Sequence, residues 1–206
     1  MIEFLEEFEG TGDHLIVAFT GVLHRMGGIP FEFHRSLGEV DAKVLFVRDL
    51  EQRWYQYDLS EIDRLAGQIR GAAAAVGANR LSCIGNSMGG FGALMFGRLC
   101  AANATLAFAP QTTILPSQTM AMGDRRWVAY QEKIEAYSLP DLNVLSAPKG
   151  RVTIHHGEDD VLDAAHAERL NWDSHRVIHT GCGHNVAKAL RERGELTTSI
   201  RNALFD

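Results

Sequence analysis

Residues 80–101 read RLSCIGNSMGGFGALMFGRLCA. A short apolar run at 80–84 is followed by a glycine-rich turn at 85–90 and by small and apolar residues at 91–101. A short apolar run bounded by glycine is typical of a buried strand, and the longer segment after it suits a helix. The stretch therefore predicts a strand, a tight turn and a helix in direct succession.

The same alternation extends along the chain. Apolar, β-branched runs, each interpreted as a strand buried on both faces, recur at 15–19, 42–47, 104–109, 152–155 and 175–178. The clearest helical spacing lies at 60–76, where Ile62, Leu65 and Ile69 form one stripe behind a start that resembles a capping box, Ser60-x-x-Asp63. This alternation predicts an α/β fold, with a mostly parallel sheet and helices on both faces.

Two segments fit the alternation less well. Residues 2–9 can form an antiparallel edge strand that turns into 15–19, or a Glu-rich amphipathic helix. Residues 111–150 hold three of the five prolines, so we interpret them as an excursion from the sheet with one short helix near 124–137. An excursion of this size is too small for a second domain, and we predict a single domain over 1–206 without a large cap.

Composition limits the classes of partner. The 206 residues are 46% hydrophobic and 22% charged, with a net charge of −6 and no basic block, which argues against nucleic acid or a membrane as the partner. The first residues are acidic, and no stretch approaches the ~20 apolar residues that span a bilayer, so we expect a cytoplasmic protein. Three cysteines without Cys-x-x-Cys spacing indicate reduced thiols.

Ser87 is the first candidate for chemistry. It lies in Gly85-Asn86-Ser87-Met88-Gly89-Gly90, at the predicted junction of strand and helix. A serine lifted above a sheet on a strained turn needs glycine two positions before and two after it, because larger side chains would collide with the neighbouring strand and helix. The helix N-terminus also favours the negative charge that develops during acyl transfer. We therefore interpret Ser87 as a nucleophile.

An acid and a base follow two later strands. Asp160 lies in Gly157-Glu158-Asp159-Asp160-Val161 and could orient a histidine, although Asp160 or Asp163 could simply cap a helix. His184 lies in Gly181-Cys182-Gly183-His184-Asn185, a loop whose two glycines free it to reach a neighbour. Each candidate follows its own strand, in the order serine, acid, histidine.

Further residues of the same sheet edge complete the hypothesis. The N–H groups of Val22 and Met88 would form an oxyanion hole, with Gly21 as the alternate to Val22. Asp49, Trp54 and Gln111 could line a substrate pocket, although the aromatic residues near Trp54 could equally dock a helix, and Asp49 could replace Asp160 as the orienting acid.

A metal centre is the competing interpretation of the segment 155–166. His155 and His156 precede several carboxylates there, but as neighbours on a strand they point to opposite faces and cannot share one ion. We predict no metal and no cofactor.

The chain resembles the α/β-hydrolase superfamily through Gly85-Asn86-Ser87-Met88-Gly89-Gly90, Gly157-Glu158-Asp159-Asp160 and Gly181-Cys182-Gly183-His184. The resemblance covers nearly the whole chain, although Thr20-Gly21 stands where many members have His-Gly. It implies Ser87 as nucleophile, His184 as general base and acid, and Asp160 as the orienting acid. It also implies the α/β-hydrolase fold and an esterase-like serine hydrolase of minimal size.

The expected reaction is cleavage of a small-molecule carboxylic ester or thioester through an acyl-serine intermediate. Two alternatives stay open at this point: transfer of the acyl group to an acceptor other than water, and a non-catalytic binding protein on the same scaffold.

Overall fold

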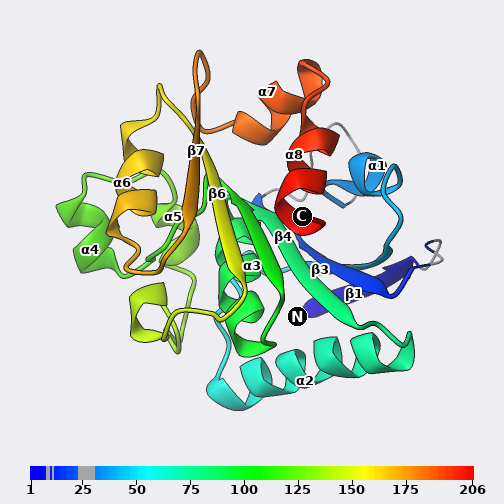
Figure 1. Ribbon diagram of the computed structural model, residues 1–206. Coiled ribbons are helices and arrows are strands. Elements are labelled where there is room, and N and C mark those ends of the chain that lie inside the picture. Colours follow the sequence, from blue (N-terminus) through cyan, green and yellow to red (C-terminus); the bar gives the residue numbers. More distant parts are fainter. Residues whose placement is uncertain (8–9, 11, 23–30) are drawn as a thin grey trace.

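The computed structural model of the protein describes residues 1–7, 10, 12–22 and 31–206, and these residues build a twisted sheet with helices on both faces (Figure 1). The sheet has seven strands in the order β1-β3-β2-β4-β5-β6-β7. Their bounds are β1 (Ile2–Glu7), β2 (His14–Phe19), β3 (Lys43–Asp49), β4 (Arg80–Asn86), β5 (Ala104–Phe108), β6 (Arg151–Gly157) and β7 (His175–His179). All neighbouring pairs are parallel except β1 with β3, as the alternation of strands and helices predicts.

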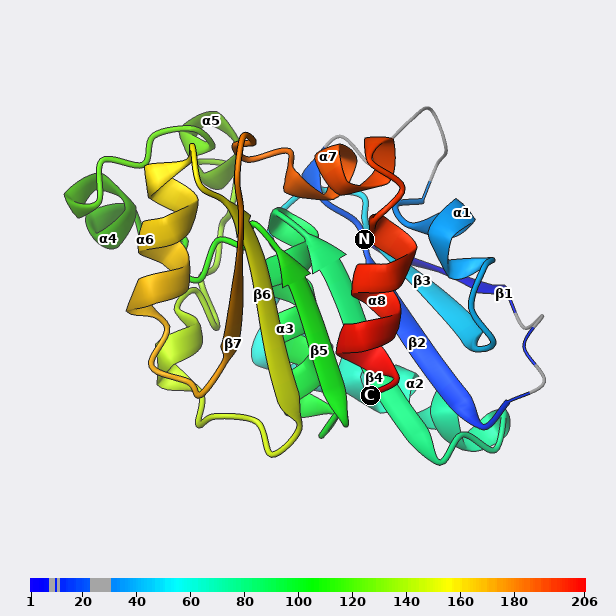
Figure 2. The same ribbon diagram turned by 45° about the horizontal axis from the view of Figure 1, so that its top comes forward.

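Helices cover the two faces in separate groups. The described helices are α1 (His34–Leu37), α2 (Leu59–Ala75), α3 (Met88–Leu99), α4 (Pro116–Ala121), α5 (Val128–Gln131), the 3-10 turn η2 (Leu142–Val144), α6 (Val161–Arg169), α7 (Val186–Glu192) and α8 (Leu196–Leu204). One hydrophobic core joins the sheet to α2, α3 and α6, and a second joins it to α1, α7 and α8. Figure 2 shows α3 and α8 on opposite sides of β5.

The apolar stripe of α2 is where the sequence places it. Ile62, Leu65 and Ile69 are buried in the first core. The start of the helix differs from the predicted capping box: Asp58 is the N-cap and accepts the N–H of Glu61 at 2.9 Å. Asp58 has the extended backbone and short carboxylate that an N-cap requires, so it provides the cap two residues before Ser60.

Two edge strands differ from expectation. The first strand of the chain is the antiparallel edge, but it pairs with β3 and not with β2, because β2 already lies between β3 and β4. The last strand, β7, was expected to be buried on both faces, yet His175, Arg176 and Ile178 are exposed. Its position at the opposite edge of the sheet leaves it only one neighbouring strand.

The excursion between β5 and β6 carries two short helices, α4 and α5, and η2, in place of the single helix expected near 124–137.

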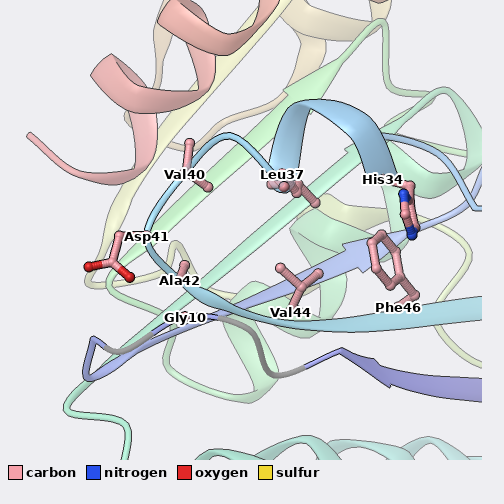
Figure 3. Close-up of a pocket in the computed structure, with 9 residues that line it drawn as sticks. Gly10, His34, Leu37, Val40, Asp41, Ala42, Val44 and Phe46 are labelled. Atoms are coloured by element: carbon pink, nitrogen blue, oxygen red, sulfur yellow. The ribbon is translucent and has the colours of Figure 1, made fainter.

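Within the part of the chain that the structure describes, no helix has both the length and the apolar character needed to cross a bilayer. A hollow between α1 and β3, lined by His34, Asp41 and Phe46 among others, contains none of the predicted catalytic residues (Figure 3).

Candidate active site

Ser87 lies in the turn between β4 and α3, with backbone angles φ 54° and ψ −118°. This left-handed backbone is unfavourable for a residue with a side chain and indicates a turn held by its surroundings. A Cβ atom at Gly85 would lie 2.0 Å from the carbonyl oxygen of Gly89, and one at Gly89 would lie 2.2 Å from that of Phe19. Both glycines are therefore required by the close approach of strand, turn and helix.

His184 joins Ser87 to a buried carboxylate. The Ser87 hydroxyl lies 3.0 Å from His184 Nε2, and His184 Nδ1 lies 2.8 Å from Asp163 Oδ2. An ionised carboxylate only accepts hydrogen bonds, so Nδ1 donates to Asp163 and Nε2 accepts from Ser87. The loop that carries His184 packs closely on the end of β6: a Cβ atom at Gly157 would lie 2.1 Å from the Cys182 carbonyl oxygen, so only glycine fits there.

The carboxylate hydrogen-bonded to His184 is that of Asp163 and not of Asp160, which corrects the predicted contact. Asp160 is the N-cap of α6, where its Oδ1 accepts the N–H groups of Leu162 at 3.1 Å and Asp163 at 3.0 Å. A carboxylate that caps a helix points back at the first turn, whereas the residue three positions later leaves that turn sideways. Asp163 is fully buried there and lies against His184.

Of the predicted oxyanion donors, Met88 directly follows Ser87, and the amide of Gly21 is already occupied. Met88 is the first residue of α3, so its N–H has no acceptor within the helix. The N–H of Gly21 donates to Glu32 Oε2 at 2.8 Å, which leaves Val22 as the other predicted donor. Burial raises the pKa of Glu32 to about 7, although hydrogen bonds from Gly21 and Asn86 and the nearby His184 lower it.

Two of the three predicted pocket residues lie beside the serine. Gln111 Oε1 lies 3.4 Å from Ser87 Oγ and accepts Trp54 Nε1–H at 3.1 Å. This second bond fixes the orientation of the amide, so the buried Gln111 Nε2 is left without an acceptor among the described residues. The Trp127 ring lies 6.3 Å from the Trp54 ring and 6.1 Å from the imidazole of His184.

Asp49 has a different role from the predicted ones. It is fully buried, and its carboxylate accepts four hydrogen bonds, from the N–H groups of Glu51, Arg53 and Tyr55 and from the Tyr57 hydroxyl. These bonds close the turn after β3 and occupy the carboxylate. Among the described residues, the hydrogen-bond partners of this carboxylate all belong to that turn, and His184 is not one of them.

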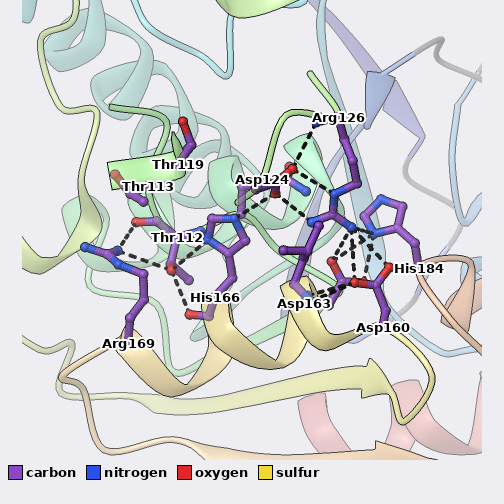
Figure 4. Close-up of polar contacts among 12 residues, drawn as sticks. Thr112, Thr113, Thr119, Asp124, Arg126, Asp160, Asp163, His166, Arg169 and His184 are labelled. Carbon is purple, nitrogen blue, oxygen red and sulfur yellow. Dashed lines mark hydrogen bonds and ion pairs between the residues drawn. The ribbon is translucent and has the colours of Figure 1, made fainter. Parts of the chain in front are cut away.

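The ligand atoms of Asp160, Asp163 and His184 lie within 4.8 Å of one another, a spacing that would suit a metal ion. The Arg126 guanidinium already supplies a cation at this position. Its Nη1 lies 2.9 Å from Asp163 Oδ1 and 3.1 Å from Asp160 Oδ2 (Figure 4). The donor set is therefore satisfied by the protein itself.

Several solved structures share this architecture. The chain aligns with EstE1, a thermostable carboxylesterase cloned from a metagenomic library, at TM-score 0.69 and 16% identity, over 100% of this chain and 90% of the other. It aligns with a hyperthermophilic esterase from the archaeon Pyrobaculum calidifontis at TM-score 0.72 and 13% identity, over 99% and 85%. The protein has the α/β-hydrolase fold.

Another protein aligned on this α/β-hydrolase fold is the capsule O-acetyltransferase of Neisseria meningitidis serogroup A, at TM-score 0.68 and 17% identity, over 98% of this chain and 91% of the other. No protein-family model matches the sequence, and a search of curated proteins finds no match. At these identities the structural neighbours show the fold, and the function must be argued from the site.

Sequence reasoning on this α/β-hydrolase fold missed three residues of the site. The sequence offers Asp163 as a helix cap or as one of several carboxylates near His155 and His156, although an acid in the first turn of the helix that follows β6 was also a signal. The bond of Glu32 to Gly21 and those of Arg126 to Asp160 and Asp163 have no sequence signal, because these partners lie 11 or more residues away along the chain. Only the folded chain brings them to the site.

Proposed function

We propose that this protein is a serine hydrolase that cleaves a small carboxylic ester or thioester through an acyl-Ser87 intermediate. The observation that carries the proposal is the continuous chain of hydrogen bonds from Asp163 through His184 to Ser87, at 2.8 and 3.0 Å, with the serine on a strained turn. Such a chain is the arrangement that activates a serine for attack on a carbonyl carbon.

The proposed reaction proceeds in two halves. Ser87 Oγ attacks the carbonyl carbon while His184 Nε2 takes the hydroxyl proton, and the imidazolium then gives that proton to the departing alcohol or thiol as its bond to carbon breaks. Water attacks the acyl-Ser87 carbon with His184 as base, and the acid leaves as His184 returns the proton to Oγ. Asp163 holds Nδ1–H and stabilises the imidazolium in both halves.

Stabilisation of the oxyanion is assigned to the Met88 and Val22 amides. Met88 is buried at the N-terminus of α3, where the backbone N–H groups and the helix dipole favour negative charge. The Gly21 amide would join them only after it leaves Glu32. No step of this mechanism uses a cofactor or a metal ion.

Gln111 and Trp127 are the residues we assign to substrate contact, beside Trp54. The Gln111 Nε2–H and Trp127 Nε1–H groups are buried and have no acceptor within the described residues. A buried donor without a partner is costly, so both groups are suited to an oxygen acceptor of a bound ligand. A polar small molecule is therefore the proposed partner, and neither nucleic acid nor membrane is needed.

Acyl transfer to an alcohol is the second candidate, because an alcohol could replace water in the second half of the same mechanism. One structural neighbour is an O-acetyltransferase, which shows that this scaffold accommodates such a reaction in that protein. Product analysis with and without added alcohols would separate the two outcomes, since only transfer yields a new ester.

Covalent labelling with a fluorophosphonate tests the proposal. We expect the wild type to be labelled and Ser87→Ala to remain unlabelled. The variant should also lose ester hydrolysis by a factor on the order of 10⁴ to 10⁶ in kcat. The matched control is Ser117→Ala, which removes an exposed hydroxyl on α4 and should retain full labelling. A wild type that resists the probe would instead support the non-catalytic binding protein. A Ser87→Ala variant that keeps most of its activity would refute Ser87 as the nucleophile.

A further inference from the structure

Arg126 lies at the centre of the charged groups behind His184. Its Nη1 atom contacts Asp163 Oδ1 at 2.9 Å, Asp160 Oδ2 at 3.1 Å and His184 Nδ1 at 3.4 Å (Figure 4). The residue belongs to the excursion between β5 and β6, not to the strand ends that carry Ser87 and His184. The excursion thus places a permanent cation against the acid of the proposed triad.

A buried carboxylate holds the guanidinium in place. Asp124 Oδ1 accepts Arg126 Nε–H at 3.0 Å, and Asp124 Oδ2 accepts Nη2–H at 2.7 Å, so the contact is bidentate. Burial opposes ionisation of Asp124, but hydrogen bonds from His166 and Arg126 outweigh it and lower the pKa of this carboxyl. Burial likewise opposes the charge of Arg126, but its bonds to Asp124 and its attraction to Asp163 outweigh burial and raise its pKa.

The far end of this network is also fixed. His166 Nδ1 accepts the N–H of Thr112 at 3.2 Å, so His166 Nε2 carries the proton that is donated to Asp124 Oδ2 at 3.1 Å. His166 is fully buried on α6, and Asp124 is 4% exposed. The orientation of the guanidinium is therefore fixed by Asp124 in the excursion and, through Asp124, by His166 on α6.

The charges that face His184 are mostly negative. Asp163 and Asp160 approach it from the start of α6, and Glu32, in the segment after β2, adds a negative charge only where its raised pKa of about 7 lets it ionise. Ser87 and the Trp127 ring complete its surroundings without a charge. Among the described residues, Arg126 is the cation that forms ion pairs with both Asp160 and Asp163.

We propose that Arg126 is a positioning residue that holds Asp163 against His184 and whose positive charge opposes protonation of the imidazole. This inference rests on the proposed function. Carboxylates near an imidazole favour its protonated form, in which it cannot accept the serine proton, and a guanidinium 3.4 Å from Nδ1 opposes that protonation. Arg126 therefore extends activity toward lower pH, and it makes the excursion part of the catalytic machinery.

The rate of fluorophosphonate labelling between about pH 5 and 9 provides the test, because it reports the serine and base without a known substrate. We expect Arg126→Gln to move the ascending limb up by about one pH unit, and Arg126→Lys, which keeps the charge, to restore at least half of that shift. The matched control is Arg125→Gln, which removes the same charge from the exposed neighbouring position and should leave the limb in place.

Asp124→Asn should shift the ascending limb in the opposite direction. It keeps Arg126 but removes a negative charge that compensates it, so the limb should move to lower pH. This variant also decides the question if Arg126→Gln does not fold. A purely structural network would lower the amount of active protein in every variant without moving the limb in opposite directions.

The outcomes separate the two proposals. Absence of labelling in the wild type would refute the proposed function. A labelled wild type whose limb stays within about 0.2 pH unit in Arg126→Gln or, where that variant does not fold, in Asp124→Asn would refute the role of Arg126 alone. An Arg126→Lys variant that shifts as far as Arg126→Gln would also refute it, because the charge would then not be the cause.

Discussion

Glu32→Gln should change how the stability of the protein depends on pH. Glu32 is 4% exposed, and burial raises the pKa of its carboxyl from 4.5 to about 7. In the unfolded chain the carboxyl is solvated and ionises near its ordinary pKa. The folded state therefore keeps a proton that the unfolded state has released over the whole interval from about pH 4.5 to 7.

The sign and size follow from this difference in bound protons. Where the folded state binds more protons, stability falls as pH rises, so the stabilising effect of neutral Glu32 is complete below pH 4.5 and lost above about 7. A shift of roughly 2.5 pKa units corresponds to about 3 kcal/mol at 1.36 kcal/mol per unit. Glutamine is neutral at every pH and can still accept the Gly21 N–H, so it carries no such loss.

Urea unfolding of the wild type and Glu32→Gln at half-unit intervals between about pH 4.5 and 8 measures the effect. We expect the free energies of unfolding to be similar at pH 4.5, and the variant to be more stable by about 3 kcal/mol above pH 7. Effects of other groups, including His14, whose pKa burial lowers to about 4, are common to both proteins and cancel in the difference.

The control is Glu168→Gln, because Glu168 is exposed on α6 and its carboxyl remains solvated in both states. Its difference from the wild type should stay flat across the same range. A difference between Glu32→Gln and the wild type that is equally flat would refute the reasoning, since the carboxyl would then ionise alike in the folded and unfolded chains.

Two further predictions concern the acid of the site. Asp163→Asn should lower kcat by about 10³- to 10⁴-fold, whereas Asp160→Asn should lower kcat by less than about tenfold and cost about 1 kcal/mol of stability as a lost helix cap. Hydrolysis rates and urea unfolding check both variants. A deeper loss of kcat in Asp160→Asn than in Asp163→Asn would make Asp160 the orienting acid. Exhaustive chelation should leave fluorophosphonate labelling unchanged, because Arg126 supplies the cation between Asp160, Asp163 and His184; labelling that disappears with chelator and returns with zinc or manganese would place a metal there.

Local patterns in the sequence were enough to predict the strands, the sheet and two members of the proposed triad. Apolar runs and their spacing depend on which faces are buried, so they specify β2 through β6 within a few residues. Gly85 and Gly89 indicate the turn at Ser87. Glycine is required at both positions by close contacts within the strand, the turn and the helix and with their immediate neighbours, so the sequence pattern records the requirement locally. The candidacy of His184 follows from its place after β7, in a loop with two glycines just before it.

Tertiary structure decided which charged groups meet. Asp160 and Asp163 differ by one turn of α6, and only the direction in which each side chain leaves the helix separates a cap from a partner of His184. Arg126, Asp124 and Glu32 come from irregular segments whose paths depend on packing against α6 and the strand ends. Charge pairing between distant segments has no periodicity along the chain, so the sequence alone could not indicate it.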